Sequence, residues 1–261
     1  MYSISEETDS DKFEQAKNYF LIGLENFEKG TYLEAEKFLF LALDLLPERL
    51  STLTNLSAVL IKLGKLEKAH EILSKGINLY PTNETLYLNF GNLHGENKNW
   101  QMSLDCYDKA IEFSPDFSEA IYSRGIALVQ LNQLEEALVS YERAIKIKPD
   151  FADAYLNRGN ALQDLNRFEE AVASYDMAIK IEPNNSEAHN NRGNALQELE
   201  RMEEAFISYG RAIEITPNSV EPYLNLGDAF QNSRHFEEAL ACYDSATVSY
   251  THLTLPTKRI V

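Results

Sequence analysis

The sequence predicts an all-α fold, a right-handed α-solenoid of stacked helix–turn–helix units. The first observation is a fixed period: six prolines recur every thirty-four residues, at Pro47, Pro81, Pro115, Pro149, Pro183 and Pro217. The second is an apolar pattern of helical period before each proline, as in LEEALVSYERAIKIKP (134–149). A fixed period of this length is typical of repeat architectures, in which each unit buries its apolar face only against its neighbours.

Each unit is expected to contain two helices. In the unit 152–185, a first helix is predicted over about 152–165, a break at Asn166–Arg167, and a second helix from Phe168 to the proline, which cannot continue it. The same elements are predicted in seven units, 16–49, 50–83, 84–117, 118–151, 152–185, 186–219 and, incomplete, 220–247. The acidic residues 1–15 are expected to form a short disordered lead-in.

A glycine recurs in the first helix of six units and an alanine in the second. A glycine inside a helix costs about 1 kcal/mol relative to alanine, so its recurrence predicts that another helix approaches closely. The expected partner is the small alanine of the second helix in the same unit. The glycines are Gly23, Gly91, Gly125, Gly159, Gly193 and Gly227, and the alanines are Ala35, Ala69, Ala137, Ala171, Ala205 and Ala239.

These residues resemble the tetratricopeptide repeat (TPR) family, over about nine-tenths of the chain. The family pattern is met in the unit 152–185 by Tyr155, Arg158–Gly159, Leu162, Ala171, Tyr175, Ala178 and Pro183. Some units depart from it: Ser57 replaces the glycine and His94 replaces an apolar residue. These departures are expected to weaken the packing between the units in the middle of the array. Trp100, the only tryptophan, is expected to be a packed core aromatic.

The last residues, 248–261, do not follow the repeat. Thr251 stands where the period predicts proline, and Pro256 comes five residues late. The segment VSYTHLTLPT is similar to translated adaptor sequence at the ends of unrelated proteins, so a non-native tail is expected from about 248. On this interpretation the natural product continued beyond 247, and the uncapped last helix exposes apolar surface through which copies could self-associate.

Composition argues against several classes of partner. The formal net charge is −17, from 24 basic and 41 acidic residues, which opposes binding to nucleic acid and to anionic membranes. The chain has no apolar run of membrane-spanning length, and its N-terminus does not resemble a signal peptide. The two cysteines, Cys106 and Cys242, are expected to be reduced thiols, so a cytoplasmic location is predicted.

The sequence does not predict an active site. The five histidines are scattered, and there is no zinc, P-loop or nucleophile-elbow motif, so no catalytic residue, metal or cofactor is expected. Pairs of glutamates such as Glu169–Glu170 recur at the start of the second helices, where the helix dipole favours negative charge. The sequence given is therefore not expected to be an enzyme, although a catalytic domain could have followed it.

Carboxamides on the first helices are the candidate functional residues. They occupy positions 6, 9 and 12 of the units, one helical turn apart on a single face. Since a carboxamide both donates and accepts hydrogen bonds, a ladder of them could hold the backbone of an extended peptide. The candidates are Asn55, Asn89, Asn92, Asn157, Asn160, Gln163, Asn191, Asn194, Gln197, Asn225 and Asp228, and Gln231 extends the stripe. The alternative is that they bond to the neighbouring helix across the stack.

The predicted function is a protein–protein interaction scaffold that binds an extended peptide or a partner protein in a concave groove. The asparagine ladder is similar to that of the TPR region of O-linked N-acetylglucosamine transferases. This resemblance implies the alternative function, the substrate-recognition part of a truncated protein O-glycosyltransferase. The basic clamp by which chaperone-cofactor TPR proteins hold acidic C-terminal peptides cannot be assembled from these residues, so ligands of that type are not expected.

Overall fold

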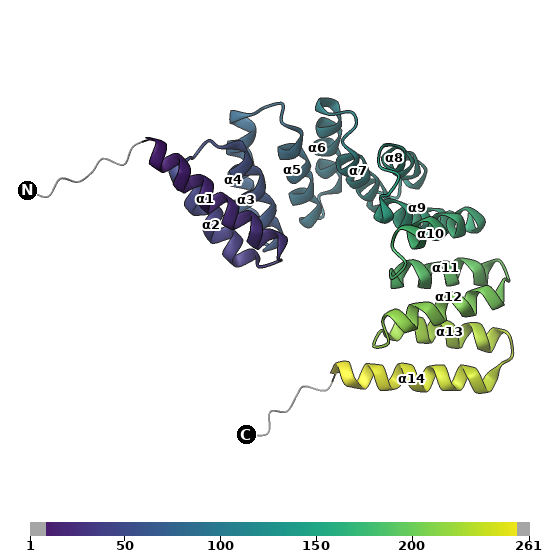
Figure 1. Ribbon diagram of the computed structural model, residues 1–261. Helices are drawn as coiled ribbons and strands as arrows, with labels where there is room; N and C mark the ends of the chain where they lie inside the picture. Colours follow the sequence, from purple (N-terminus) through teal and green to yellow (C-terminus); the bar gives the residue numbers. More distant parts are fainter. Residues whose placement is uncertain (1–8, 255–261) are drawn as a thin grey trace, which may run out of the picture. The chain divides into compact units, whose positions relative to one another are not determined.

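The computed structural model describes the backbone of residues 9–254 and the side chains of residues 9–247. Within this range the chain forms fourteen helices and no strand, which confirms the predicted all-α fold (Figure 1). The helices are α1 (Asp9–Glu28), α2 (Tyr32–Leu45), α3 (Leu50–Lys62), α4 (Leu66–Leu79), α5 (Glu84–Glu96), α6 (Trp100–Phe113), α7 (Ser118–Gln130), α8 (Leu134–Ile147), α9 (Ala152–Asp164), α10 (Phe168–Ile181), α11 (Ser186–Glu198), α12 (Met202–Ile215), α13 (Val220–Asn232) and α14 (Phe236–Thr254).

The helices form two compact units that divide after Leu131. In each unit, helices that are consecutive in the sequence pack against one another, as expected for a stack of helical hairpins. Successive odd-numbered helices also contact each other. In the first unit α1 contacts α3, α3 contacts α5 and α5 contacts α7; in the second unit α9 contacts α11 and α11 contacts α13. Among the described residues no such contact joins the even-numbered helices. The odd-numbered helices, the predicted first helices, therefore form one continuous layer within each unit.

The ends of the helical region differ from the prediction. Residues 9–15 were expected to lack structure, yet α1 already begins at Asp9, with Asp9 and Asp11 in its first turn, where the helix dipole favours negative charge. At the other end α14 continues to Thr254, past the predicted limit of 247. The remainder of the predicted lead-in, residues 1–8, and residues 255–261 of the predicted tail lie outside the described residues.

The recurring glycine does allow a close approach, but the expected partner was wrong. A Cβ atom on Gly159 would lie 2.5 Å from Cε1 of Tyr175, and one on Gly193 would lie 2.5 Å from Cε1 of Tyr209. Gly91 faces Tyr107 even more closely, at 2.3 Å. The glycine is thus needed because a tyrosine ring of the second helix lies directly on the first helix. The alanine of the second helix is buried, but the atoms nearest to the place of the missing glycine Cβ belong to the tyrosine ring and not to the alanine.

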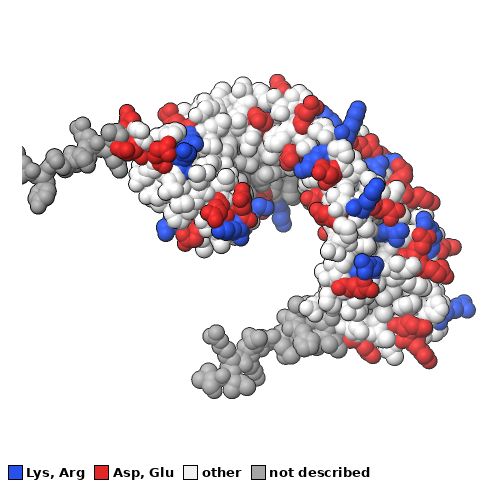
Figure 2. All heavy atoms as spheres, in the orientation of Figure 1, with Lys and Arg blue, Asp and Glu red and all other residues white. Residues whose placement is uncertain are grey.

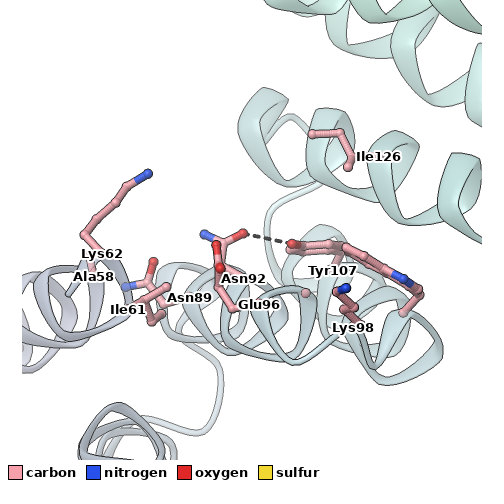
Figure 3. Close-up of a pocket in the computed structure, with 11 residues that line it drawn as sticks. Ala58, Ile61, Lys62, Asn89, Asn92, Glu96, Lys98, Tyr107 and Ile126 are labelled. Carbon is pink, nitrogen blue, oxygen red and sulfur yellow. Dashed lines mark hydrogen bonds between the residues drawn. The ribbon is translucent and has the colours of Figure 1, made fainter. Parts of the chain in front are cut away.

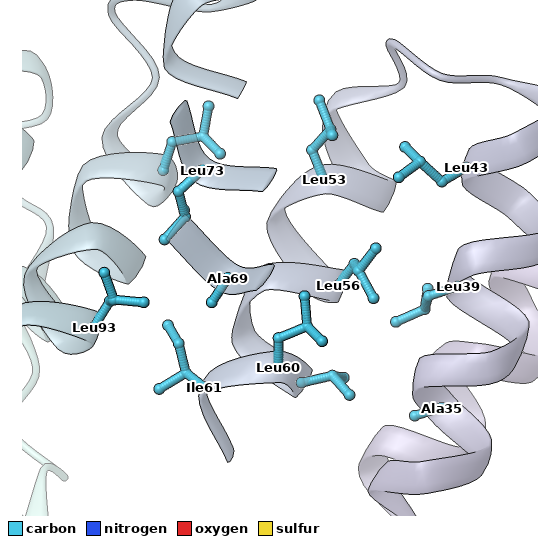
Figure 4. Packing of buried hydrophobic residues seen from close by; sticks show 12 residues of the cluster. Ala35, Leu39, Leu43, Leu53, Leu56, Leu60, Ile61, Ala69, Leu73 and Leu93 are labelled. Atoms are coloured by element: carbon cyan, nitrogen blue, oxygen red, sulfur yellow. The ribbon is translucent and has the colours of Figure 1, made fainter. Parts of the chain in front are cut away.

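The core of the first unit is a cluster of aliphatic side chains shared by α2, α3, α4 and α5 (Figure 4). Leu39, Leu56, Leu60 and Leu73 are fully buried in it. Burying a leucine side chain contributes about 1.5–3 kcal/mol, so the successive hairpins stabilise one another through these contacts. Leu93 of α5 belongs to the same cluster, which therefore extends over three successive predicted repeats.

Next to this core, His94 occupies a position where the other repeats carry Leu60, Leu128 and Leu162. Its side chain is 7% exposed, and its Nδ1 is buried without a hydrogen-bond partner in the described structure. Burial lowers the pKa of His94, and the neighbouring His70 lowers it further. The folded state therefore favours neutral His94, whereas the unfolded chain binds a proton at the usual pKa of about 6.5.

We expect stability to be full above about pH 6.5 and to decrease as the pH falls from there towards the lowered pKa of folded His94. The substitution His94→Leu removes this part of the pH dependence. It also raises the free energy of unfolding by about 1–2 kcal/mol at pH 7, because no polar atom is left unpaired. Thermal unfolding followed by circular dichroism between pH 5 and pH 8 measures both effects. A less stable His94→Leu variant at pH 7 contradicts the assignment.

The turn between the two helices of each repeat contains one residue with left-handed backbone geometry. Gly30 and Gly64 fill this position in the first two repeats, and Lys98, Asn132, Asn166, Glu200 and Arg234 fill it in the others, all with φ between 57° and 74°. Hydrogen bonds of the Schellman type close the turn, such as Arg201 N–H to the Leu196 carbonyl at 2.9 Å. Glutamate is disfavoured in this geometry by about 1–2 kcal/mol, so the fold imposes strain at Glu200.

Replacing Glu200 with glycine is therefore expected to increase the free energy of unfolding by about 0.5–1 kcal/mol, despite the added flexibility of the unfolded chain. Asn166→Gly is the matched control, since asparagine tolerates this geometry, and its effect is expected to be near zero. Chemical denaturation of both variants tests the prediction. Equal destabilisation by the two substitutions would show that the turn is not strained.

Both cysteines are free thiols, as expected: Cys106 is buried and Cys242 is partly exposed. Burial raises the pKa of Cys106 to about 11, which keeps this thiol protonated and a poor nucleophile. No helix within the described residues is both long and apolar enough to cross a membrane.

Candidate functional site

The predicted site residues, which are carboxamides except for Asp228, all lie on the odd-numbered helices. In the first unit Asn55 belongs to α3, and Asn89 and Asn92 belong to α5. In the second unit the side chains are carried by three successive first helices, α9, α11 and α13. They are Asn157, Asn160 and Gln163 of α9, Asn191, Asn194 and Gln197 of α11, and Asn225, Asp228 and Gln231 of α13.

A tyrosine hydroxyl holds each asparagine at position 9. Tyr175 Oη donates to Asn160 Oδ1 at 2.8 Å, and Tyr209 Oη donates to Asn194 Oδ1 at the same distance. The first unit repeats the arrangement, with Tyr107 Oη donating to Asn92 Oδ1 at 2.8 Å. In each pair the tyrosine of the second helix follows the asparagine by fifteen residues.

The glutamines at position 12 converge on the same hydroxyls. Gln163 Oε1 lies 3.3 Å from Tyr175 Oη, and Gln197 Oε1 lies 3.2 Å from Tyr209 Oη. Since a hydroxyl has a single proton to donate, the shorter bond to asparagine is the main one. The tyrosines were not among the predicted site residues. Their signal in the sequence is their own thirty-four-residue recurrence, at Tyr107, Tyr141, Tyr175, Tyr209 and Tyr243.

The hydrogen bonds leave the amide nitrogens at position 9 available. The oxygens of Asn92, Asn160 and Asn194 accept from tyrosine, whereas in the described structure their Nδ2 atoms make no hydrogen bond. All three side chains are partly exposed. We call Asn160 and Asn194, one repeat apart in the second unit, the donor row. It presents N–H groups that are able to bind an acceptor.

The asparagines at position 6 behave differently, because their nitrogens are engaged. Asn89, 7% exposed, donates to the Thr54 carbonyl at 2.9 Å and to Ser57 Oγ at 3.0 Å. Asn191 donates to Asn160 Oδ1 at 3.0 Å, and Asn225 donates to Asn190 Oδ1 at 2.9 Å. All four bonds reach the preceding first helix. Asn89, Asn191 and Asn225 therefore bond to the neighbouring helix across the stack, as the alternative interpretation expects.

Two other asparagines at position 6 bond within their own helix. Asn55 donates to the Ser51 carbonyl at 2.8 Å, and Asn157 donates to the Asp153 carbonyl at 3.1 Å. Both side chains remain partly exposed. The predicted ladder is therefore not uniform. Position 6 mainly serves packing and local bonding, while position 9 supplies the free donors.

Asp228 ends the donor row. Its Oδ1 accepts from Tyr243 Oη at 2.7 Å, so it replaces asparagine in the tyrosine contact, but a carboxylate has no N–H to offer. This hydrogen bond, together with desolvation, raises the pKa of Tyr243 to about 12. Gln231 lies 3.0 Å from the same hydroxyl.

In the first unit, Asn89 and Asn92 border a hollow of about 510 Å³ that is also lined by Ile61, Trp100 and Ile126 (Figure 3). Trp100 was expected to be a packed core residue, but it is only partly buried and forms a wall of this hollow. The space exists because position 12 of this repeat is Gly95, where the second unit has glutamine. A side chain at Gly95 would begin 3.3 Å from the Trp100 ring.

Several arginines of the second unit form ion pairs with acidic side chains. Arg158 binds Glu142 at 2.9 Å and Ser174 Oγ at 2.6 Å, which ties α9 to both neighbouring helices. Basic and acidic side chains are accordingly interspersed over the visible face of this unit (Figure 2). The glutamate pairs lie in the first turns of the second helices, as their dipole interpretation requires. Among the described residues no three acidic, histidine or cysteine side chains are placed to hold a metal ion.

Stacked helical hairpins that present a layer of first helices define a class, the helical-repeat proteins that bind other proteins. The chain belongs to the tetratricopeptide repeat family. A model described as TPR repeat matches residues 125–166, 159–200 and 193–233. Models described as tetratricopeptide repeat match residues 106–139, 50–83 and 220–247. The family establishes the chain as an interaction scaffold built from TPR hairpins. No curated protein sequence matches it.

Solved structures agree on the fold. The APC/C hetero-tetramer Cut9-Hcn1 is 15% identical, with a TM-score of 0.74 over 83% of this chain and 43% of that chain. PilF of Pseudomonas aeruginosa is 18% identical, with a TM-score of 0.71 over 85% of this chain and 99% of that chain. YrrB, described as a TPR protein with an unusual peptide-binding site, is 23% identical, with a TM-score of 0.57 over 70% and 95%. At these identities the likeness concerns the fold alone.

Proposed function

We propose that the chain binds an extended peptide, or an extended segment of a partner protein, along the first helices α9, α11 and α13. The observation that carries this proposal is the donor row, with the free Nδ2 groups of Asn160 and Asn194 held at equivalent places in successive repeats. An extended peptide offers backbone carbonyls at regular intervals and so matches a repeated donor. Binding through carbonyls does not depend on the side chains of the ligand.

The proposal is for a binding protein rather than an enzyme, without cofactor or metal. Nucleic acid and membranes are not proposed as partners, because the net charge of −17 repels phosphate groups. The reduced cysteines are consistent with a cytoplasmic setting.

Peptides selected from a random twelve-residue display library against the full chain provide the test. We expect the affinity of the tightest peptide to be measurable by fluorescence anisotropy. The variant Asn160→Ala/Asn194→Ala is expected to lose most of this affinity. The matched control is Asn157→Ala, on the same face but with its nitrogen engaged by the Asp153 carbonyl. Failure to select any peptide, or equal affinity in both variants, would contradict the proposal.

The alternative is a role in substrate recognition for a protein O-glycosyltransferase, based on the asparagine ladder. It makes the same use of the donor row and adds a catalytic domain beyond residue 247. Sequencing the gene downstream of this position tests it. A transferase reading frame supports the alternative, and a stop codon soon after residue 247 excludes it.

Self-association through α14 is also proposed. Phe236 and Leu240 of this helix are 65% and 61% exposed. A second copy could cover them, because burial of two large apolar side chains is favourable. Concentration-dependent light scattering that disappears in the variant Phe236→Glu/Leu240→Glu supports this contact, whereas scattering typical of a monomer at all concentrations contradicts it.

A further inference from the structure

The tyrosines beneath the donor row are placed rigidly. The side chains of Tyr175 and Tyr209 are 0% and 1% exposed, and each ring lies against the glycine of the facing helix. A Cβ on either glycine would fall within 3.0 Å of three ring atoms. The ring therefore has little room to move, and the hydroxyl at its tip is held at one place under the asparagine.

The hydroxyls also remain protonated. Burial raises the pKa of Tyr175 and Tyr209 well above the usual range, and nearby carboxylates raise it further, Asp164 and Glu187 for Tyr175 and Asp228 and Glu198 for Tyr209. A protonated hydroxyl has its proton available for the asparagine oxygen at neutral pH.

The orientation of Asn160 is fixed from two sides. Its Oδ1 accepts from Tyr175 Oη at 2.8 Å and from Asn191 Nδ2 at 3.0 Å. Turning the carboxamide over would place its N–H groups against the amide donor of Asn191 and lose this bond. Both lone pairs of the oxygen are in use, so Asn160 offers the ligand only donors. Asn194 has the corresponding tyrosine bond at 2.8 Å.

We propose that Tyr175 and Tyr209 are positioning residues that set the polarity of the binding site, so that it selects the backbone carbonyl groups of the ligand and not its backbone N–H groups. This inference rests on the proposed function, since it concerns the same donor row. The hydroxyls do not touch the ligand: they act by holding the asparagine oxygens away from it. Without the hydroxyls, Asn160 keeps only the bond from Asn191 and Asn194 loses its tyrosine bond, so the carboxamides are less restrained from rotating and presenting their oxygens.

The chain contains a natural comparison for this arrangement. Asp228 keeps the tyrosine bond, at 2.7 Å from Tyr243 Oη, but has no donor. The substitutions Asn160→Asp and Asn194→Asp should therefore preserve the tyrosine contact while removing the N–H groups. Conversely, Tyr175→Phe and Tyr209→Phe preserve the ring on its glycine while removing the hydroxyl.

The experiment uses the tightest peptide from the twelve-residue library and a series of its analogues, each with one backbone amide replaced by a thioamide, whose sulfur is a weaker acceptor than oxygen. With the unaltered full chain we expect at least two analogues to bind about 3–10-fold more weakly. In Tyr175→Phe/Tyr209→Phe the affinity for the parent peptide falls about 3–10-fold, and the discrimination against thioamides shrinks. Asn160→Asp/Asn194→Asp binds the parent peptide at least as weakly as the tyrosine double variant does, and it retains the thermal midpoint of the unaltered chain.

Tyr223→Phe, which alters a tyrosine of α13 outside the row, is the matched control and should bind like the unaltered chain. A tyrosine double variant that keeps both its affinity and its thioamide discrimination overturns the inference, even if Asn160→Ala/Asn194→Ala has confirmed the proposed function. Uniform affinity across the thioamide series overturns it as well. If the unaltered chain binds no peptide, the proposed function and this inference both fail.

Discussion

Replacing Gly193 with alanine lowers the free energy of unfolding by about 1–3 kcal/mol, although alanine is the better helix former by about 1 kcal/mol. The reason is that the added Cβ would lie 2.5 Å from Cε1 and 2.7 Å from Cδ1 of Tyr209. Because that ring is itself buried, either it or the helix must move. Chemical denaturation followed by circular dichroism measures the loss.

Gly210 of α12 is the matched control, since a Cβ there would meet no atom within 4 Å. Gly210→Ala is expected to stabilise the chain by about 1 kcal/mol through helix propensity alone. The second repeat suggests a rescue, because it carries Ser57 and Leu73 at the two equivalent positions. Gly193→Ser should therefore be tolerated better when combined with Tyr209→Leu. If Gly193→Ala and Gly210→Ala stabilise equally, the account of this contact is wrong.

The variant Asn160→Ala/Asn194→Ala reduces the affinity for the selected peptide by about tenfold or more, since two donors are lost. It also lowers the free energy of unfolding by about 1–2 kcal/mol in total. The second effect follows because Tyr175 and Tyr209 lose their shorter hydrogen bond and Asn191 loses its acceptor. Helix propensity alone predicts the opposite sign, because alanine is the better helix former. The tyrosine bonds reverse that expectation.

Asn157→Ala serves as the comparison for stability. The nitrogen of Asn157 bonds to the Asp153 carbonyl of its own helix, which is already satisfied by the helix itself in the usual pattern. Alanine gains about 0.5–0.7 kcal/mol of helix propensity there. Stability is therefore expected to be equal or higher. A marked loss in Asn157→Ala, with none in Asn160→Ala/Asn194→Ala, would contradict the division of the carboxamides into donors and packing residues.

The fold could be predicted because the thirty-four-residue period determines both the local structure of each unit and its packing against the next. It places proline after each second helix, glycine in the first helix and apolar residues at helical spacing, so local and tertiary preferences agree. The site could be predicted only in part. A sequence shows which helical face carries carboxamides, but an amide can donate or accept. Which of the two it offers to a ligand depends on a neighbour such as Tyr175, fifteen residues away from Asn160.

The incorrect details have the same origin. The glycine signalled a close contact, but not that its partner is a tyrosine ring rather than an alanine. Trp100 fills a core position in the repeat pattern, yet Gly95 leaves one side of it open. The start of α1 at Asp9 was missed because an acidic, polar stretch has the composition of a disordered segment, whereas Asp9 and Asp11 favour a helix start. In each case the outcome depends on which groups meet in space.

The central claim is that the donor row binds the backbone of an extended peptide, and a crystal structure of the full chain with the selected peptide tests it most directly. The account predicts an extended peptide along α9 and α11, with backbone carbonyl oxygens about 2.7–3.2 Å from Nδ2 of Asn160 and Asn194, and with Tyr175 and Tyr209 still bonded to the asparagine oxygens. A peptide bound on the even-numbered helices, or one whose N–H groups face these asparagines, would contradict it.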